Sequence, residues 1–184
     1  MATAVSVPVE EYLSHTYRPD RDYVNGKILR RHLGERWHAS VQLMISMIFG
    51  QHRHEWGLVP LPEQRVQVKP DRYRVPDICV VRAEDAFEPI LKTPPVLCVE
   101  ILSTKDRFSR ILARVEDYVS MGVQEVWIID PRSREVWTID ASGRPTPFAG
   151  EVLTLNASVA NVPVAEIFAL IDEAPGATHD ERRN

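Results

Sequence analysis

The stretch Arg74-Val-Pro-Asp-Ile-Cys-Val-Val81, followed after a polar loop by Pro95-Val-Leu-Cys-Val-Glu-Ile-Leu-Ser-Thr104, decides the fold. Both runs are rich in β-branched residues and are bounded by proline and polar residues, which is typical of buried strands. Each run carries one carboxylate, Asp77 or Glu100. If the two strands are neighbours, one register brings these two acids together.

The two carboxylates need a partner, because an ionised acid in an apolar strand is costly unless it is paired or holds a cation. Each alone has a simpler interpretation: Asp77 follows Pro76 and could open its strand from a turn, and Glu100 could pair with an arginine. For both together, a divalent metal that removes their repulsion is the better interpretation. Oxygen ligands favour magnesium or manganese over zinc.

Composition indicates one ordinary globular domain. The chain has 184 residues, of which 44% are hydrophobic and 26% charged, and its formal net charge is -4. We expect one domain over residues 1–172 and a disordered tail over 173–184. No apolar run approaches the roughly 18 residues of a membrane span, and the N-terminus lacks a secretory apolar region, so we expect a cytoplasmic protein with no membrane contact. Its two cysteines are too few for a disulfide framework.

The first half of the chain predicts a hairpin and then a long helix. Asn25-Gly26 supplies the positive φ angles of a type I′ turn within residues 22–29. A helical period runs from Glu35 to about residue 54, and Glu35, His38 and Gln42 form a polar stripe beside its apolar face. Such a stripe can reach a site that the core encloses, although a solvated helix edge is the commoner case.

The second half alternates strands and helices. After strands at residues 58–60 and 65–69, and the two quoted runs, a helix is predicted over residues 106–121, capped by Ser103-Thr104. Arg114 lies at the border of its apolar arc, from where it could present its charge at the strand ends or pair on the surface with Glu116 or Asp117. Strands at 125–130, 135–139 and 147–155 and a helix at 163–171 follow.

The strand, helix and strand across residues 96–130 form a crossover, which predicts a parallel pair. The fold class is therefore α/β (α+β), a mixed sheet flanked by helices with an N-terminal β-hairpin.

These segments together resemble the PD-(D/E)XK nuclease superfamily, the restriction-endonuclease-like fold, and more closely its Uma-type branch of putative restriction endonucleases. The resemblance rests on the order and spacing of several motifs: Asp22-Tyr-Val-Asn-Gly-Lys, Glu35 with His38, Val75-Pro-Asp-Ile, Val99-Glu-Ile-Leu-Ser, Tyr118, Gly122-Val-Gln-Glu-Val-Trp-Ile-Ile-Asp-Pro131 and Val164-Ala-Glu-Ile-Phe168.

The resemblance implies a metal site for Mg²⁺ or Mn²⁺. Asp77, Glu100 and the backbone carbonyl of Ile101 would hold the ion, and Glu35 would contribute from the first helix. The superfamily's lysine two positions after the second acid is Leu102 here. The Uma-type branch looks as if it moved that lysine to the following helix, at the position of Arg114. Arginine keeps the charge but cannot deprotonate to act as a base.

The resemblance therefore favours a metal-dependent endonuclease that acts on DNA. In it, His38 or Glu35 would orient or deprotonate water, and Arg114 or Lys105 would stabilise the transition state. Arg72 and Arg74 are candidates for phosphate contacts. The replaced lysine favours an alternative, a catalytically inactive relative that binds nucleic acid or a protein. An oligomerising scaffold is a third option, and a homodimer is left open by the resemblance.

Overall fold

The computed structural model describes residues 6–30, 35–104, 106–155 and 158–174. Its elements, in chain order, are α1 (Val9–Ser14), β1 (Asp22–Val24), β2 (Lys27–Leu29), α2 (Arg36–Gln51), α3 (Arg53–Trp56), β3 (Leu58–Pro62), β4 (Val66–Lys69), β5 (Arg72–Arg74), β6 (Ile78–Arg82), β7 (Leu97–Ile101), α4 (Phe108–Met121), β8 (Glu125–Asp130), β9 (Glu135–Ile139), β10 (Thr146–Pro147), β11 (Val152–Thr154), β12 (Asn161–Pro163) and α5 (Val164–Asp172).

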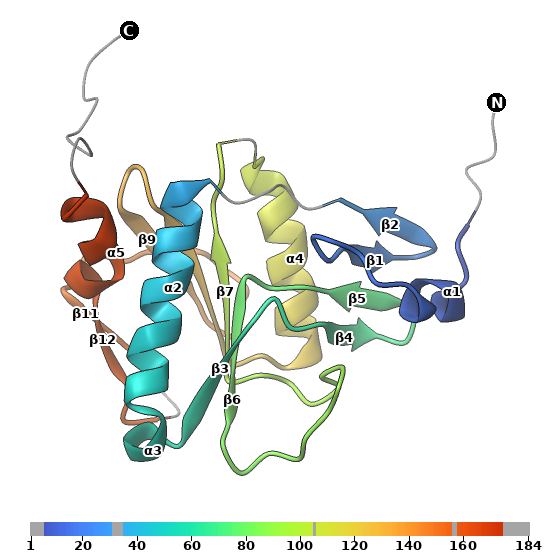
Figure 1. The fold of residues 1–184 in the computed structure, drawn as a ribbon, viewed down its shortest axis with the longest axis horizontal. Coiled ribbons are helices and arrows are strands. Elements are labelled where there is room, and N and C mark those ends of the chain that lie inside the picture. Colours follow the sequence, from blue (N-terminus) through green and yellow to red (C-terminus); the bar gives the residue numbers. More distant parts are fainter. Residues whose placement is uncertain (1–5, 31–34, 105, 156–157, 175–184) are drawn as a thin grey trace, which may run out of the picture.

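A mixed six-stranded sheet, in the order β10-β9-β8-β7-β6-β3, forms the centre of the fold. β7 and β8 are parallel and are joined through α4, as the crossover pattern predicted, whereas the other neighbours are antiparallel. Helices α2 and α5 cover one face of the sheet and α4 covers the other (Figure 1). Alternation along the strands separates the two cores. Ile78 and Val99 belong to the α2 side, and Cys79 and Cys98 belong to the α4 side.

A smaller sheet, in the order β2-β1-β5-β4, lies beside the central one and includes the predicted hairpin. Asn25 and Gly26 have φ angles of 48° and 79°, which confirms the predicted turn. The link Val75-Pro76-Asp77 carries the chain from β5 in this sheet to β6 in the central sheet. Asp77 therefore lies where the two sheets meet.

Two sequence predictions about local structure were wrong. The helix after β7 begins at Phe108, with Arg107 as N-cap and no side-chain cap. The predicted cap residue Ser103 instead donates to Asp106 Oδ2 through both its backbone N–H and its hydroxyl, each at 2.8 Å. The predicted strand at 147–155 is divided into β10, which pairs with β9, and β11, which pairs with the unpredicted β12.

Most of the tail predicted to be disordered, residues 175–184, lies outside the described residues. Within the described part of the chain, no helix is both long and apolar enough to cross a membrane.

Candidate active site

Asp77 opens β6 from a bend and faces the start of the link after β7. Because Ile78 lies opposite Val99 in the antiparallel β6–β7 pair, Asp77 is at the level of Glu100. The predicted register is thus present. The Asp77 carboxylate, however, turns along the strand end, where its Oδ2 accepts the Ile101 N–H at 2.7 Å.

The polar stripe of α2 reaches this strand end. His38 Nε2 lies 3.2 Å from Asp77 Oδ2, and Gln42 Nε2 donates to the Asp77 carbonyl at 2.9 Å. Glu35 lies further out, where it accepts Thr104 Oγ1 at 2.6 Å and pairs with Arg132 Nη2 at 2.7 Å. The stripe therefore fixes both the backbone and the side chain of Asp77, and Glu35 ties the segment after β7 to the loop after β8.

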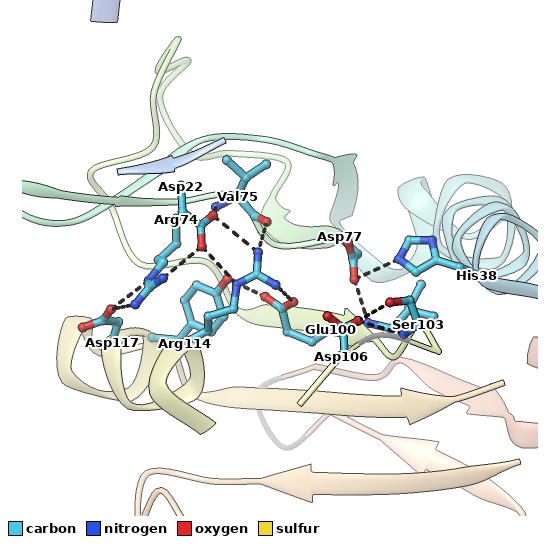
Figure 2. A network of polar contacts seen from close by, with 12 residues as sticks. Asp22, His38, Arg74, Val75, Asp77, Glu100, Ser103, Asp106, Arg114 and Asp117 are labelled. Carbon is cyan, nitrogen blue, oxygen red and sulfur yellow. Dashed lines mark hydrogen bonds and ion pairs between the residues drawn. The ribbon is translucent and has the colours of Figure 1, made fainter. Parts of the chain in front are cut away.

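Glu100 is fully buried on the α4 side of the sheet and both its oxygens accept donors from α4. The Tyr118 hydroxyl donates to Oε1 at 2.6 Å, and Arg114 Nη1 forms an ion pair with Oε2 (Figure 2). Burial, and then the negative charge of Glu100, raise the pKa of Tyr118 well above its usual value, so the phenol stays protonated and donates. Of the interpretations open for Glu100, pairing with an arginine is the arrangement present.

Arg114 joins three elements through one guanidinium. Besides Glu100 on β7, its Nη2 donates to the Val75 carbonyl at 3.0 Å, and its Nε lies 3.2 Å from Asp22 Oδ2 on β1. Burial lowers the pKa of Arg114, but attraction to Asp22 and Glu100 outweighs it, and the pKa is raised well above the ordinary value. Of the two alternatives for Arg114, the structure has the one in which the charge lies at the strand ends, and no pairing with Glu116 or Asp117 forms among the described residues.

The ion pairs continue away from the cavity through a second arginine. Asp22 accepts Arg74 Nη1 at 2.9 Å and the Val75 N–H at 3.1 Å. Asp117 of α4 accepts Arg74 Nε at 2.8 Å and Arg72 Nη1 at 2.7 Å. We call these residues the ionic network; it comprises three arginines and three carboxylates, namely Arg72, Arg74, Arg114, Asp22, Glu100 and Asp117.

Sequence reasoning did not predict that the two aspartates of the ionic network, Asp22 and Asp117, are buried. Asp22 is the first residue of a hairpin and Asp117 lies within α4, and an acid at either place is ordinarily exposed. Arg72 and Arg74 were predicted as phosphate contacts, and that role stays a prediction. In the structure their guanidinium groups bind these two aspartates, and Arg74 is buried.

A cavity of about 470 Å³ opens where the two sheets and the start of α4 meet. Its lining includes His38, Asp77 and Ile101 from the strand end, and Arg114 from α4. Arg30, after β2, and Arg110, on α4, also line it, and both are exposed. Neither guanidinium has an ion pair or hydrogen bond with another described residue, so their charges can meet a ligand.

Glu100 does not line this cavity, because Arg114 stands on that side of it. Across the described residues, no group of three or more His, Cys, Asp and Glu side chains could hold a metal ion. The metal role of Asp77 and Glu100 stays a prediction, and in this arrangement the Glu100 oxygens are bound by Arg114 and Tyr118. Lys105, the predicted substitute for the displaced lysine, lies outside the described residues.

Comparison with known proteins supports a nuclease fold. The model of the Uma2 family, described as "Putative restriction endonuclease", matches residues 9–162. The structure of a putative nuclease belonging to DUF820 from Anabaena variabilis is similar, with a TM-score of 0.77 and 18% identity, over 89% of this chain and 98% of that one. No curated protein matches the chain.

Proposed function

Since the chain belongs to the Uma2 family of putative restriction endonucleases, we propose that it is an endonuclease that hydrolyses DNA phosphodiester bonds. The observation that supports this best is the cavity at the ends of β6 and β7, which combines the His38–Asp77 pair with two arginines that have no partner among the described residues. Acid–base groups beside free positive charge are what hydrolysis of a phosphodiester requires.

We assign the phosphate contacts of this site to Arg30 and Arg110. Arginine binds phosphate oxygens with its planar fork, and such contacts hold the backbone without reading sequence. Arg72 and Arg74 are less suited, because Asp117 and Asp22 already accept their hydrogen bonds. Arg30 and Arg110 come from the hairpin and from α4, so a bound strand would lie between these two elements.

In this proposal His38 orients or deprotonates the attacking water. Its Nε2 lies 3.2 Å from Asp77 Oδ2, and the Ile101 N–H, at 2.7 Å from the same oxygen, holds the carboxylate in place. Arg114 lines the cavity with a permanent positive charge, which could stabilise charge on a transferring phosphate. Glu35 is bound to Thr104 and Arg132 at the margin, so we give it a positioning role there.

The restriction-endonuclease-like family generally uses divalent metals, and we propose Mg²⁺ or Mn²⁺ as the cofactor. The donors at hand, the Asp77 carboxylate and the Ile101 carbonyl, are oxygens, which these ions prefer. Glu100 does not join them while Arg114 covers it, so the residues as arranged do not fit the ion and we assign it no step.

A cleavage assay tests the proposal directly. Supercoiled plasmid and linear DNA are incubated with the wild type in Mg²⁺ or Mn²⁺, with and without chelator. We expect chelator-sensitive nicking that is lost in His38→Ala and Arg110→Ala but retained in Arg53→Ala, which removes an exposed arginine of α3 far from the cavity lining. No cleavage by the wild type under any of these conditions would contradict the endonuclease.

The ion pair of Arg114 with Glu100 favours a second candidate, an inactive relative that binds nucleic acid. The chain has Leu102 at the superfamily's lysine position and Arg114 at the lysine position of the Uma-type branch, so neither position carries a lysine. This candidate predicts DNA binding that survives chelation, without cleavage. Binding that weakens steeply with salt, and less steeply in Arg30→Ala and Arg110→Ala, would support the phosphate contacts in either case.

A further inference from the structure

Arg114 occupies the side of Glu100 that would otherwise face the cavity. We propose that its guanidinium is the resident cation of the Asp77–Glu100 pair, and that a divalent metal ion can bind both acids only when Arg114 is displaced or neutralised. The proposal rests on the metal cofactor of the proposed function, but not on cleavage.

The first argument is the position of Glu100 and Arg114 relative to the cavity. Asp77, Ile101 and Arg114 line the cavity, whereas Glu100 is fully buried and does not. Arg114 Nη1 donates to Glu100 Oε2 (Figure 2). The Tyr118 hydroxyl, also from α4, donates to Glu100 Oε1. An ion in the cavity would therefore meet a guanidinium before it met the second acid.

The second argument concerns the charges around Glu100 and Asp77. The three arginines and three carboxylates of the ionic network balance one another, and Lys69, which is half-exposed, lies 3.9 Å from Asp117 Oδ1 at the end of the network away from Glu100. Asp77 then offers a divalent ion one negative charge, beside the positive charge of Arg114. A neutral residue at position 114 removes the guanidinium from Glu100, and the charges of Glu100 and Asp77 together then match a divalent ion.

The third argument is that Arg114 is held in place. Its Nη2 donates to the Val75 carbonyl at 3.0 Å, and its Nε lies 3.2 Å from Asp22 Oδ2. Asp22 is itself fixed by Arg74 Nη1 and by the Val75 N–H. Because arginine stays charged at every accessible pH, the competing cation is present under all solution conditions.

Mn²⁺ binding measured by calorimetry or electron paramagnetic resonance, without DNA, tests the inference. We expect weak binding by the wild type and binding tighter by more than about tenfold in Arg114→Gln, because a like charge within a few ångströms is removed. Adding Glu100→Gln to Arg114→Gln abolishes the gain. Tight wild-type binding, or a gain in Arg114→Gln that does not need Glu100, would overturn the proposal.

Arg110→Gln is the matched control. It removes the same charge from the same helix and the same cavity, but Arg110 is exposed and has no contact with Glu100. We expect it to change Mn²⁺ affinity by less than about threefold, because exposed charges are screened. An equal gain in Arg110→Gln and Arg114→Gln would show a general charge effect and would refute the resident cation.

Folding is controlled by a second variant, since Arg114→Gln leaves buried carboxylates without their arginine. Asp22→Asn/Arg114→Gln keeps the arginines and carboxylates of the ionic network equal in number and still uncovers Glu100. It is therefore also expected to bind Mn²⁺ more tightly than the wild type, and failure to do so would count against the proposal. Circular dichroism verifies the fold of each variant. Because DNA is absent throughout, tight Mn²⁺ binding by the wild type overturns this inference alone, whereas absence of cleavage overturns the endonuclease alone.

Discussion

Replacing Asp22 with asparagine removes one charge from the ionic network and keeps the shape of the side chain. Asp22 is 4% exposed and faces Arg74 Nη1 at 2.9 Å, the Val75 N–H at 3.1 Å and Arg114 Nε at 3.2 Å. The variant leaves two buried guanidinium groups facing an amide. Removing one partner of a buried ion pair costs about 3–5 kcal/mol, because buried charge of one sign is then left in excess.

The expected loss can be measured in the free energy of unfolding. For a domain of this size, 1 kcal/mol corresponds to roughly 2–4 °C, so Asp22→Asn should lower Tm by about 6–20 °C. Asp172→Asn is the matched control, because Asp172 pairs with Arg134 at the surface, where the two side chains are 50% and 28% exposed. Exposed pairs contribute about 0–1 kcal/mol, so this variant should unfold within a few degrees of the wild type.

Comparison of the two variants tests whether the buried ionic network stabilises the fold. Urea or thermal unfolding at pH 7 is followed by circular dichroism for the wild type, Asp22→Asn and Asp172→Asn. If Asp22→Asn costs no more than Asp172→Asn, the ionic network does not contribute to the fold in the way its burial implies. A large loss in Asp22→Asn alone supports it.

Three further variants test other parts of the structure. Tyr118→Phe removes the hydroxyl that donates to Glu100 at 2.6 Å and should destabilise by about 1–3 kcal/mol in urea unfolding, since a buried carboxylate loses a donor; an unchanged midpoint would contradict that bond. Burial raises the pKa of Cys79 from 9.0 to about 12, and that of Cys98 well above 9.0. The stabilisation that comes from keeping these thiols protonated is complete below pH 9 and is lost as pH rises towards 12. Between pH 8 and about 10.5, the Tm of the wild type should therefore fall further than the Tm of Cys79→Ala/Cys98→Ala. Equal falls in Tm would refute this pH dependence. Gly122→Ala should cost about 1 kcal/mol in the same unfolding assay, because Gly122 ends α4 at a φ of 103° and a Cβ there meets only ordinary contacts; a neutral change would show that α4 tolerates another ending.

Local patterns predicted most of the fold, because each signal was complete within a few residues. Asn25-Gly26 is sufficient for a type I′ turn, and the period of α2 is long enough to exclude a strand. The strand expected at 147–155 was wrong because its division depends on partners. β10 pairs with β9, and β11 pairs with β12 from later in the chain.

The site was predictable only where a strand or helix pattern fixed the direction of a side chain. Helical spacing indicated that His38 and Gln42 share one face that could reach an enclosed site, and both contact Asp77 in the structure. Burial of Asp22 and Asp117 could not be read from the sequence. Asp117 meets Arg74 across 43 residues and Asp22 meets it across 52, so nothing local distinguishes these acids from solvated ones.

Arginine at position 114 has consequences that a lysine would not have. A guanidinium has five donors in a rigid fork, and here they reach Glu100 on β7, the Val75 carbonyl before β6 and Asp22 on β1. An ammonium is a point charge with three donors and could pair with Glu100 while leaving Asp22 to Arg74. The residue thus joins the hairpin to the central sheet as well as covering the acid. Loss of activity in an Arg114 variant would therefore not by itself assign it a catalytic role; a change in Mn²⁺ affinity without a change in fold would separate the two effects.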